Sequence, residues 1–119
     1  MTDTPPPEPQ EITEAIQSVL YEFTQERDDI TANDPITVNS GYCREFAEEV
    51  LDYLGYPSEI TQYDAWYVHS WIEFDGQHYD AEHPRGVKHP REFPIWERVT
   101  ADEYEMAVSD CDILNQKTP

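Results

Sequence analysis

A β-hairpin pattern between residues 66 and 82 restricts the fold of this chain more than any other feature of its sequence. Residues 66–74 are rich in aromatic and β-branched side chains, Asp75-Gly76 is a favoured two-residue turn, and residues 77–82 form the returning strand. This turn places His69 opposite Glu82 and gives the hairpin one polar face. That face carries His69, Trp71 and Glu73 on the first strand and His78, Asp80 and Glu82 on the second.

Ahead of the hairpin, apolar residues recur at helical spacing and predict a first helix that begins at Glu11. Its apolar face consists of Ile12, Ala15, Ile16, Val19, Leu20 and Phe23. The helix is expected to end before Asn33-Asp34-Pro35, a helix-breaking cluster, and an irregular stretch then leads to Gly41. Residues 1–10 contain four of the ten prolines and predict a disordered tail, so residues 11–119 are expected to form a single domain.

A second helix is expected from Tyr42 to Leu54, with Ser40 as its N-cap and Gly55 at its end. A short strand is expected to follow at residues 58–63, just before the hairpin. The buried face of this helix is expected to consist of Phe46, Ala47, Val50, Leu51 and Leu54.

After the hairpin, residues 84–98 contain three prolines and little periodicity, which predicts a loop. Four of the seven basic side chains lie in it: Arg85, Lys88, Arg91 and Arg98. The loop is therefore either a solvated connection or a surface that attracts an acidic substrate or partner. A last short helix from Thr100 to Val108 begins with a capping box of Thr100 and Glu103. The expected fold class is α+β, with N-terminal helices packed on a small antiparallel sheet of three or four strands.

Acidic residues dominate the charge, because 26 Asp and Glu against 7 Lys and Arg give a formal net charge of −19. Such a surface repels nucleic-acid phosphates and anionic membranes, so neither is an expected partner. No run of about 18 apolar residues predicts a membrane span, and residues 1–10 lack the basic and apolar parts of a secretory signal. Two cysteines are too few for a disulfide framework, so a cytoplasmic protein is expected.

The acids are spread along a chain that is also 13% aromatic, which favours a folded acidic surface over a disordered polyanion. Lysine occurs only at Lys88 and Lys117. Crowded carboxylates repel one another less in concentrated salt, where the screening length falls to about 3 Å. The composition therefore favours a halophilic protein from a salt-rich cytoplasm. The alternative is an ordinary acidic domain, or one that binds a basic partner.

The residues that carry chemistry lie on the second expected helix and the hairpin. Cys43 falls in the first turn of that helix, where free N–H groups and the helix dipole stabilise a thiolate. His69 has Glu82 opposite and Asp80 as its diagonal neighbour. A Cys at a helix start, a His on a strand and a carboxylate on the next strand are the components of a thiolate–imidazolium nucleophile.

Residues 39–84 contain a series of short motifs, in the order Gly41-Tyr-Cys43-Arg-Glu-Phe-Ala47, Leu54-Gly55-Tyr-Pro57, His69-Ser-Trp71, Gly76 and Tyr79-Asp80. In this order they resemble the transglutaminase-like branch of the papain-like cysteine proteases. This resemblance implies a papain-like core in which Cys43 is the nucleophile and His69 the general base, and it requires no cofactor. The substrate would be a protein or peptide amide. The reaction class stays open between a peptidase, an amidase or deamidase, and a transglutaminase-like cross-linking enzyme.

The third catalytic residue is open between Asp80 and Glu82, and Asp80 is favoured because Asp is usual in that role. An oxyanion hole would use the backbone N–H of Cys43 and one upstream donor, for which Asn39 is the candidate. Trp71 is expected to be a core or cleft-wall aromatic that contacts substrate.

Two other functions compete with catalysis. In the first, the chain is a non-catalytic binding or structural module that keeps the fold, and Cys43 is a small buried hydrophobe, as Cys111 is expected to be. In the second, it is a metal-binding domain that uses Cys43 with residues of the His and acid cluster. That cluster consists of His69, His78, Asp80, Glu82, His83 and His89. The close ligand pairs typical of zinc sites do not occur in it, so no metal is expected.

Overall fold

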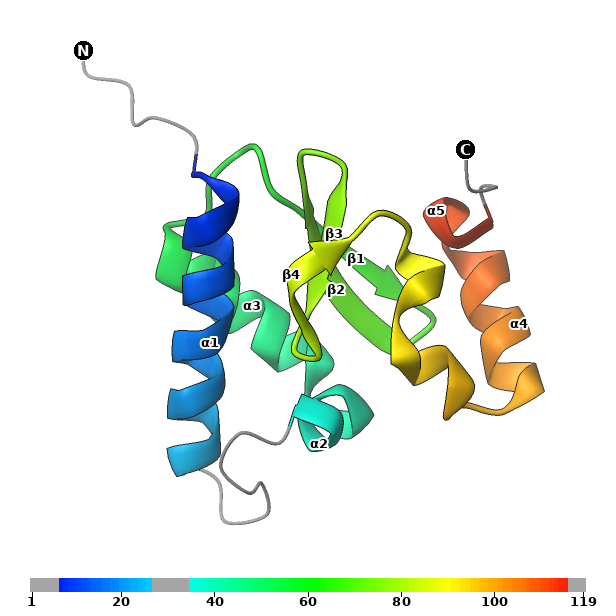
Figure 1. Cartoon of the computed structure of the whole chain (residues 1–119). Coiled ribbons are helices and arrows are strands. Elements are labelled where there is room, and N and C mark those ends of the chain that lie inside the picture. Colours follow the sequence, from blue (N-terminus) through cyan, green and yellow to red (C-terminus); the bar gives the residue numbers. More distant parts are fainter. Residues whose placement is uncertain (1–6, 27–34, 116–119) are drawn as a thin grey trace.

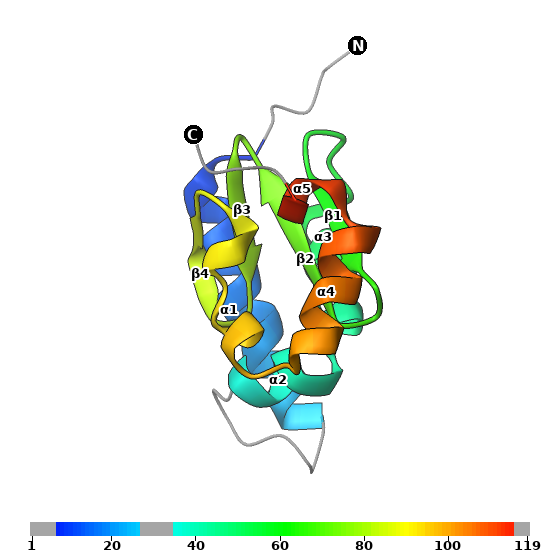
Figure 2. The ribbon, with the colours of Figure 1, turned by 90° about the vertical axis from the view of Figure 1, so that its right-hand side faces the viewer.

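The computed structural model describes residues 7–26 and 35–115, and it confirms an α+β fold built on an antiparallel sheet (Figure 1). The four strands are neighbours in space in the order in which they occur in the chain. They are β1 (Thr61–Ala65), β2 (His69–Phe74), β3 (Gln77–Asp80) and β4 (His83–Val87). Helices α1 (Pro9–Glu26) and α3 (Cys43–Leu54) cover one side of the sheet, and α4 (Ala101–Asp110) and α5 (Asp112–Asn115) lie on the other (Figures 1 and 2).

Alternation along β2 explains why the sheet is covered on both sides. Ile72 and Phe74 belong to the core under α1 and α3, whereas Trp71 belongs to the second core with Phe93 and the C-terminal helices. In α1 the predicted apolar face is confirmed, since Ile12, Ala15, Ile16, Val19 and Phe23 are buried. The central strand is therefore held between two apolar layers.

Helix α1 begins at Pro9, two residues earlier than expected. Proline suits the first turn of a helix because its missing N–H has no partner to lose there. Residues 1–6 of the expected tail and the first two residues of the expected breaker, Asn33-Asp34, lie outside the described residues.

The expected irregular stretch before Gly41 is wrong, because residues Pro35–Gly41 form a short helix, α2. Pro35, expected as a helix breaker, is the first residue of this helix, a position that proline tolerates. Val38 and Asn39 are buried. Ser40 is therefore not an N-cap, since its hydroxyl donates to the Ile36 carbonyl 2.7 Å away. Tertiary packing of two residues thus outweighs the weak helix propensity of this segment.

Helix α3 begins at Cys43 and has no side-chain cap. Its expected end is confirmed, because Gly55 has a φ of 80° and its N–H bonds to the Asp52 carbonyl. The buried residues Phe46, Ala47, Val50 and Leu51 form the expected apolar face toward the sheet.

The β2–β3 turn is confirmed at Asp75-Gly76, where both residues have positive φ angles, as a type I′ turn requires. The register pairs Phe74 with Gln77, as expected, and continues to Ile72 opposite Tyr79.

The hairpin is shorter than expected, because β3 ends at Asp80 and turns directly into β4. Asp80 pairs with His83, so Glu82 lies in the β3–β4 turn and the expected pair of Glu82 with His69 does not form. The other end is also shifted. Trp66 and Tyr67 have positive φ angles and form the β1–β2 turn, so β2 begins only at His69.

The expected loop at residues 84–98 is largely structured. It contributes β4 and two 3-10 helices, η1 (Pro90–Glu92) and η2 (Pro94–Glu97). The capping box of α4 is confirmed, with Glu103 N–H donating to Thr100 Oγ1 at 3.1 Å. Across residues 7–26 and 35–115, no helix combines the length and the apolar character needed to cross a membrane.

Candidate active site

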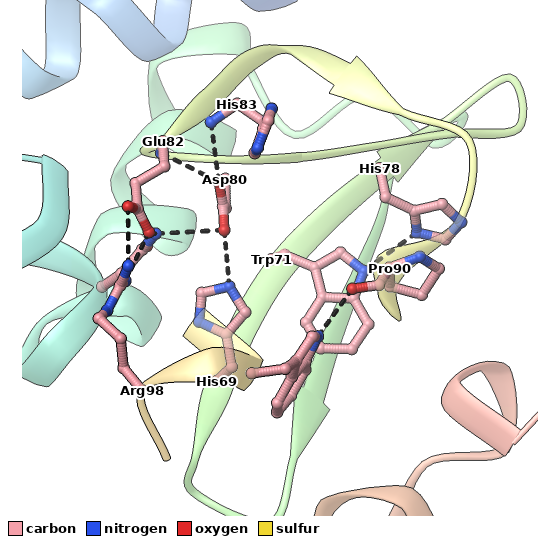
Figure 3. A network of polar contacts seen from close by, with 10 residues as sticks. His69, Trp71, His78, Asp80, Glu82, His83, Pro90 and Arg98 are labelled. Atoms are coloured by element: carbon pink, nitrogen blue, oxygen red, sulfur yellow. Dashed lines mark hydrogen bonds and ion pairs between the residues drawn. The ribbon is translucent and has the colours of Figure 1, made fainter. Parts of the chain in front are cut away.

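The fold brings Cys43, His69 and Asp80 together from three elements. Cys43 is the first residue of α3, His69 is the first residue of β2, and Asp80 is the last residue of β3. His69 Nε2 lies 2.9 Å from Asp80 Oδ2 (Figure 3). The two side chains are 0% and 1% exposed. The diagonal contact expected across the hairpin is therefore present and is shielded from solvent.

Four donors surround the Asp80 carboxylate. Oδ2 accepts hydrogen bonds from His69 Nε2 and from Asn39 Nδ2, the latter at 3.2 Å. Oδ1 accepts from the backbone N–H groups of Glu82 at 3.0 Å and His83 at 2.9 Å, across the β3–β4 turn. This turn therefore fixes the carboxylate from behind, and the bond to Nε2 leaves Nδ1 of His69 free to face Cys43.

Glu82, the alternative partner of His69, binds other groups. Its carboxylate forms a bidentate ion pair with Arg98 at 2.6 and 3.0 Å and accepts a hydrogen bond from Asn39 Nδ2 at 2.8 Å. Burial raises the pKa of Glu82, but these hydrogen bonds and the charges of Arg98 and His69 lower it by more. Asp80, not Glu82, is thus the carboxylate that contacts the imidazole.

The thiol of Cys43 interacts with the imidazole of His69, whose Nδ1 has no hydrogen-bond partner of ordinary geometry. Burial raises the pKa of Cys43, but His69 and the backbone N–H groups of Ser70 and Arg44 lower it by more, so the net shift is downward.

The pKa of His69 moves in the opposite direction, to about 9. Burial lowers it, but Asp80 and Cys43 both favour the imidazolium and outweigh burial. A depressed thiol pKa beside a raised imidazole pKa favours a thiolate–imidazolium pair at neutral pH.

Aromatic rings enclose His69. Trp71 stacks on it with a centroid distance of 5.7 Å, while Phe93 and Trp96 approach at 5.4 and 5.8 Å in edge geometry. Rings packed in this way exclude water from the imidazole, so its charged form depends on the contacts with Asp80 and Cys43. Phe93 and Trp96 were not expected at the site. The apolar run FPIW within an otherwise polar, proline-rich segment is the feature of the sequence that marks it as buried.

Cys43 opens onto a cleft of about 470 Å³, whereas His69 is not among the residues that line it. Cys43 is half-buried, and it both lines the cleft and interacts with the imidazole of His69. The cleft is lined by Asn39, Ser40, Gly41, Cys43, Arg44, Glu45, Asp64, Trp66, Tyr67, Val68, Ser70 and Asp110. The cleft is therefore bordered by two exposed aromatic rings and by several carboxylates.

Two expected site residues have other positions or partners. Trp71 does not line the cleft, because it is 1% exposed and its Nε1 donates to His78 Nδ1 at 3.0 Å. Burial and the charge of His89 lower the pKa of His78 to about 4, which suits an acceptor nitrogen. Asn39 does line the cleft, but its Nδ2 donor is already bonded to two carboxylates and is not a free oxyanion donor.

The histidine and acid cluster does not converge on a point. Within the described part of the chain, no three His, Cys, Asp or Glu side chains are arranged to hold a metal ion. The basic segment is also partly engaged inside the protein, since Arg98 binds Glu82 and Arg91 donates to the Leu114 carbonyl. Arg85 and Lys88 remain exposed.

No family model, no curated protein and no solved structure matches this chain, so its geometry alone identifies the candidate site.

Proposed function

We propose that the chain is a cysteine-dependent acyl transferase or hydrolase that acts on amides, with a transglutaminase-like, papain-like core. The supporting observation is the buried hydrogen bond of His69 to Asp80 together with a thiol that interacts with the same imidazole and lines a cleft. Cys43 is the nucleophile, His69 the general base and acid, and Asp80 the residue that orients His69 and stabilises its charged form.

Acylation follows from this arrangement. The Cys43 thiolate attacks the carbonyl carbon of a bound amide, and the carbonyl π electrons move onto the oxygen. As the tetrahedral intermediate collapses, the C–N bond breaks and the proton on His69 Nδ1 moves to the leaving nitrogen. The products of this half are a free amine and a thioester on Cys43.

Deacylation reverses these roles. Water or a second amine adds to the thioester carbonyl and gives a proton to His69 Nδ1, and the C–S bond breaks to release the thiolate. Water as the acceptor gives a peptidase, amidase or deamidase. An amine gives a cross-linking enzyme.

The cleft is large enough for part of a peptide, because its volume falls within the range of about 300–1,000 Å³ that is usual for ligand pockets. Because Cys43 lines this cleft, the site suits a substrate protein or peptide that carries the amide on its own surface.

An acetyl donor tests the proposal without a known substrate. We expect p-nitrophenyl acetate to acetylate Cys43 of the native chain, with release of p-nitrophenolate and an acetyl group located on the Cys43 peptide by mass spectrometry. Cys111→Ala is the matched control and should react as the wild type does, whereas Cys43→Ala should not react. Added amines that shorten the life of the thioester more than water does would identify a cross-linking enzyme. Failure of native Cys43 to be acetylated would favour the non-catalytic binding module.

A further inference from the structure

A polar network behind the candidate active site joins three segments that are far apart in the sequence. Asn39 of α2 bridges two carboxylates through Nδ2, with Asp80 Oδ2 at 3.2 Å and Glu82 Oε2 at 2.8 Å. Arg98, directly after η2, completes the network by its bidentate bond to Glu82 (Figure 3). Glu82 and Arg98 are therefore connected to Asp80 through the amide of Asn39.

Burial of this network costs free energy unless its charged and polar groups are paired. Asn39 is 1% exposed and the Glu82 side chain 9%, so two carboxylates share one amide group in a largely dry place. Outward from the cleft, the order of groups is the Cys43 thiolate, the His69 imidazolium, the Asp80 carboxylate, the neutral Asn39 amide, the Glu82 carboxylate and the Arg98 guanidinium. Arg98 and the imidazolium together compensate the two acids.

We propose that Asn39, Glu82 and Arg98 position the Asp80 carboxylate and, through it, the imidazole of His69. This inference rests on the proposed function, since it concerns the same reaction.

Each member acts at a definite atom. Asn39 holds the oxygen of Asp80 that binds His69, so it limits rotation of the carboxylate about its terminal bond. Glu82 accepts the same Nδ2 group and keeps the amide turned toward both acids. Arg98 supplies the counter-charge that allows Glu82 to stay there as a carboxylate. The Cys43 thiol interacts with His69 and with backbone groups of Ser70 and Arg44, and none of the three network residues is among these partners. They are therefore positioning residues and not catalytic ones.

The test compares Asn39→Ala, Glu82→Gln and Arg98→Ala with the wild type in two measurements. One is the rate of Cys43 acetylation by p-nitrophenyl acetate as a function of pH. The other is the NMR resonance of the His69 Nε2 proton, which reports whether the hydrogen bond to Asp80 is ordered, and the pKa of the same ring. The charged or titratable groups around this ring are Cys43 of α3, Asp80 of β3, Glu82 of the β3–β4 turn and, one step further, Arg98.

We expect Cys43 of each variant to be acetylated about tenfold more slowly than Cys43 of the wild type. This factor corresponds to the loss of about one charge-assisted hydrogen bond. The Nε2 proton should also exchange faster with water. Arg98→Lys, which keeps the charge beside Glu82, should recover most of the rate. Glu105→Gln is the matched control, because it removes an exposed acid of α4 that lines neither the cleft nor the network, and it should change neither measurement.

If Asn39→Ala fails to fold, Arg98→Ala still decides the matter, because the Arg98 side chain is 34% exposed. Wild-type rates and an unchanged Nε2 resonance in the folded variants, with Asp80→Asn strongly impaired, would overturn the positioning role and leave the proposed function standing. A wild-type Cys43 that is not acetylated at all would remove the proposed function and the positioning role together.

Discussion

The two cysteines of this chain lie in different surroundings, and these surroundings shift the pKa values of the two thiols in opposite directions. Cys43 begins α3, faces a cleft and has His69 beside it, and the net shift of its pKa is downward. Cys111 follows the end of α4 and is 5% exposed in the second apolar core. Burial raises its pKa, and this effect outweighs the backbone hydrogen bonds of Leu114 and Ile113, which lower it; the charges of Asp110 and Asp112 add smaller upward contributions.

The contrast is one of partners more than of helix ends. Both thiols meet backbone N–H groups near a helix start, Cys43 at α3 and Cys111 just before α5, but of the two only Cys43 has an imidazole beside it. The difference teaches that the imidazole partner, and not the helix start alone, favours the thiolate of Cys43.

The largest expected effect separates the two carboxylates behind His69. Asp80→Ala should reduce the rate of Cys43 acetylation on the order of 10³-fold, because the imidazole loses the group that orients it and stabilises its charge. Glu82→Ala should cost only about tenfold, because Glu82 acts through Asp80. Both variants should keep the wild-type circular dichroism spectrum. A larger loss in Glu82→Ala than in Asp80→Ala would show that the wrong carboxylate has been assigned.

Salt should affect the surface and the site differently. With a net charge of −19, repulsion among exposed carboxylates is a large destabilising contribution in dilute buffer. We expect the melting temperature to rise steeply as KCl increases into the molar range, while the reactivity difference between Cys43 and Cys111 persists, because buried pairs are screened little. A melting temperature that does not change with KCl would contradict the halophilic interpretation.

The smallest expected effect lies on the Cys111 side of the molecule. Thr100→Ala removes the hydroxyl that accepts from Glu103 N–H at the start of α4. It should lower the free energy of unfolding by about 1 kcal/mol, measured by urea denaturation. Cys43 acetylation should stay at the wild-type rate, since the side chain of Thr100 bonds to Glu103 and not to Cys43, His69 or Asp80. A matching loss of acetylation would mean that the two regions are coupled.

Local chemistry allowed much of this molecule to be predicted from its sequence. The Asp75-Gly76 turn, the αL end of α3 at Gly55 and the Thr100 capping box each depend on a few adjacent residues. The same turn placed His69 near both Asp80 and Glu82, because the register of a hairpin is set by its loop, but it did not choose between the two carboxylates.

The parts that were missed depend on contacts distant in sequence. Helix α2 forms from a segment of weak propensity whose Val38 and Asn39 are buried. The β3–β4 turn at Asp80 removed Glu82 from the strand, which pattern alone did not indicate. The enclosure of His69 by Phe93 and Trp96 required η1 and η2 to fold back over the sheet. Propensity and periodicity describe neighbours along the chain, so they do not place such segments.

The central claim is that Cys43 is a thiolate held by His69, and competitive alkylation measures it most directly. The raised pKa of His69 means that the imidazolium persists as pH rises until about pH 9, and the lowered pKa of Cys43 means that its thiolate forms below the ordinary thiol range. The stability that His69 gains from its partners is complete below its ordinary pKa of 6.5 and is lost as pH rises through about 9. Reactivity at about pH 6.5 therefore reports the ion pair.

We predict that iodoacetamide labels Cys43 of the folded protein in concentrated KCl at about pH 6.5 well before Cys111, as read from the two labelled peptides by mass spectrometry. His69→Ala should shift the pH dependence of Cys43 labelling upward, and unfolding should make the two cysteines equal. If Cys43 is as slow as Cys111 in the folded wild-type protein, or if His69→Ala leaves its labelling unchanged, the thiolate–imidazolium pair does not exist and the catalytic proposal is wrong.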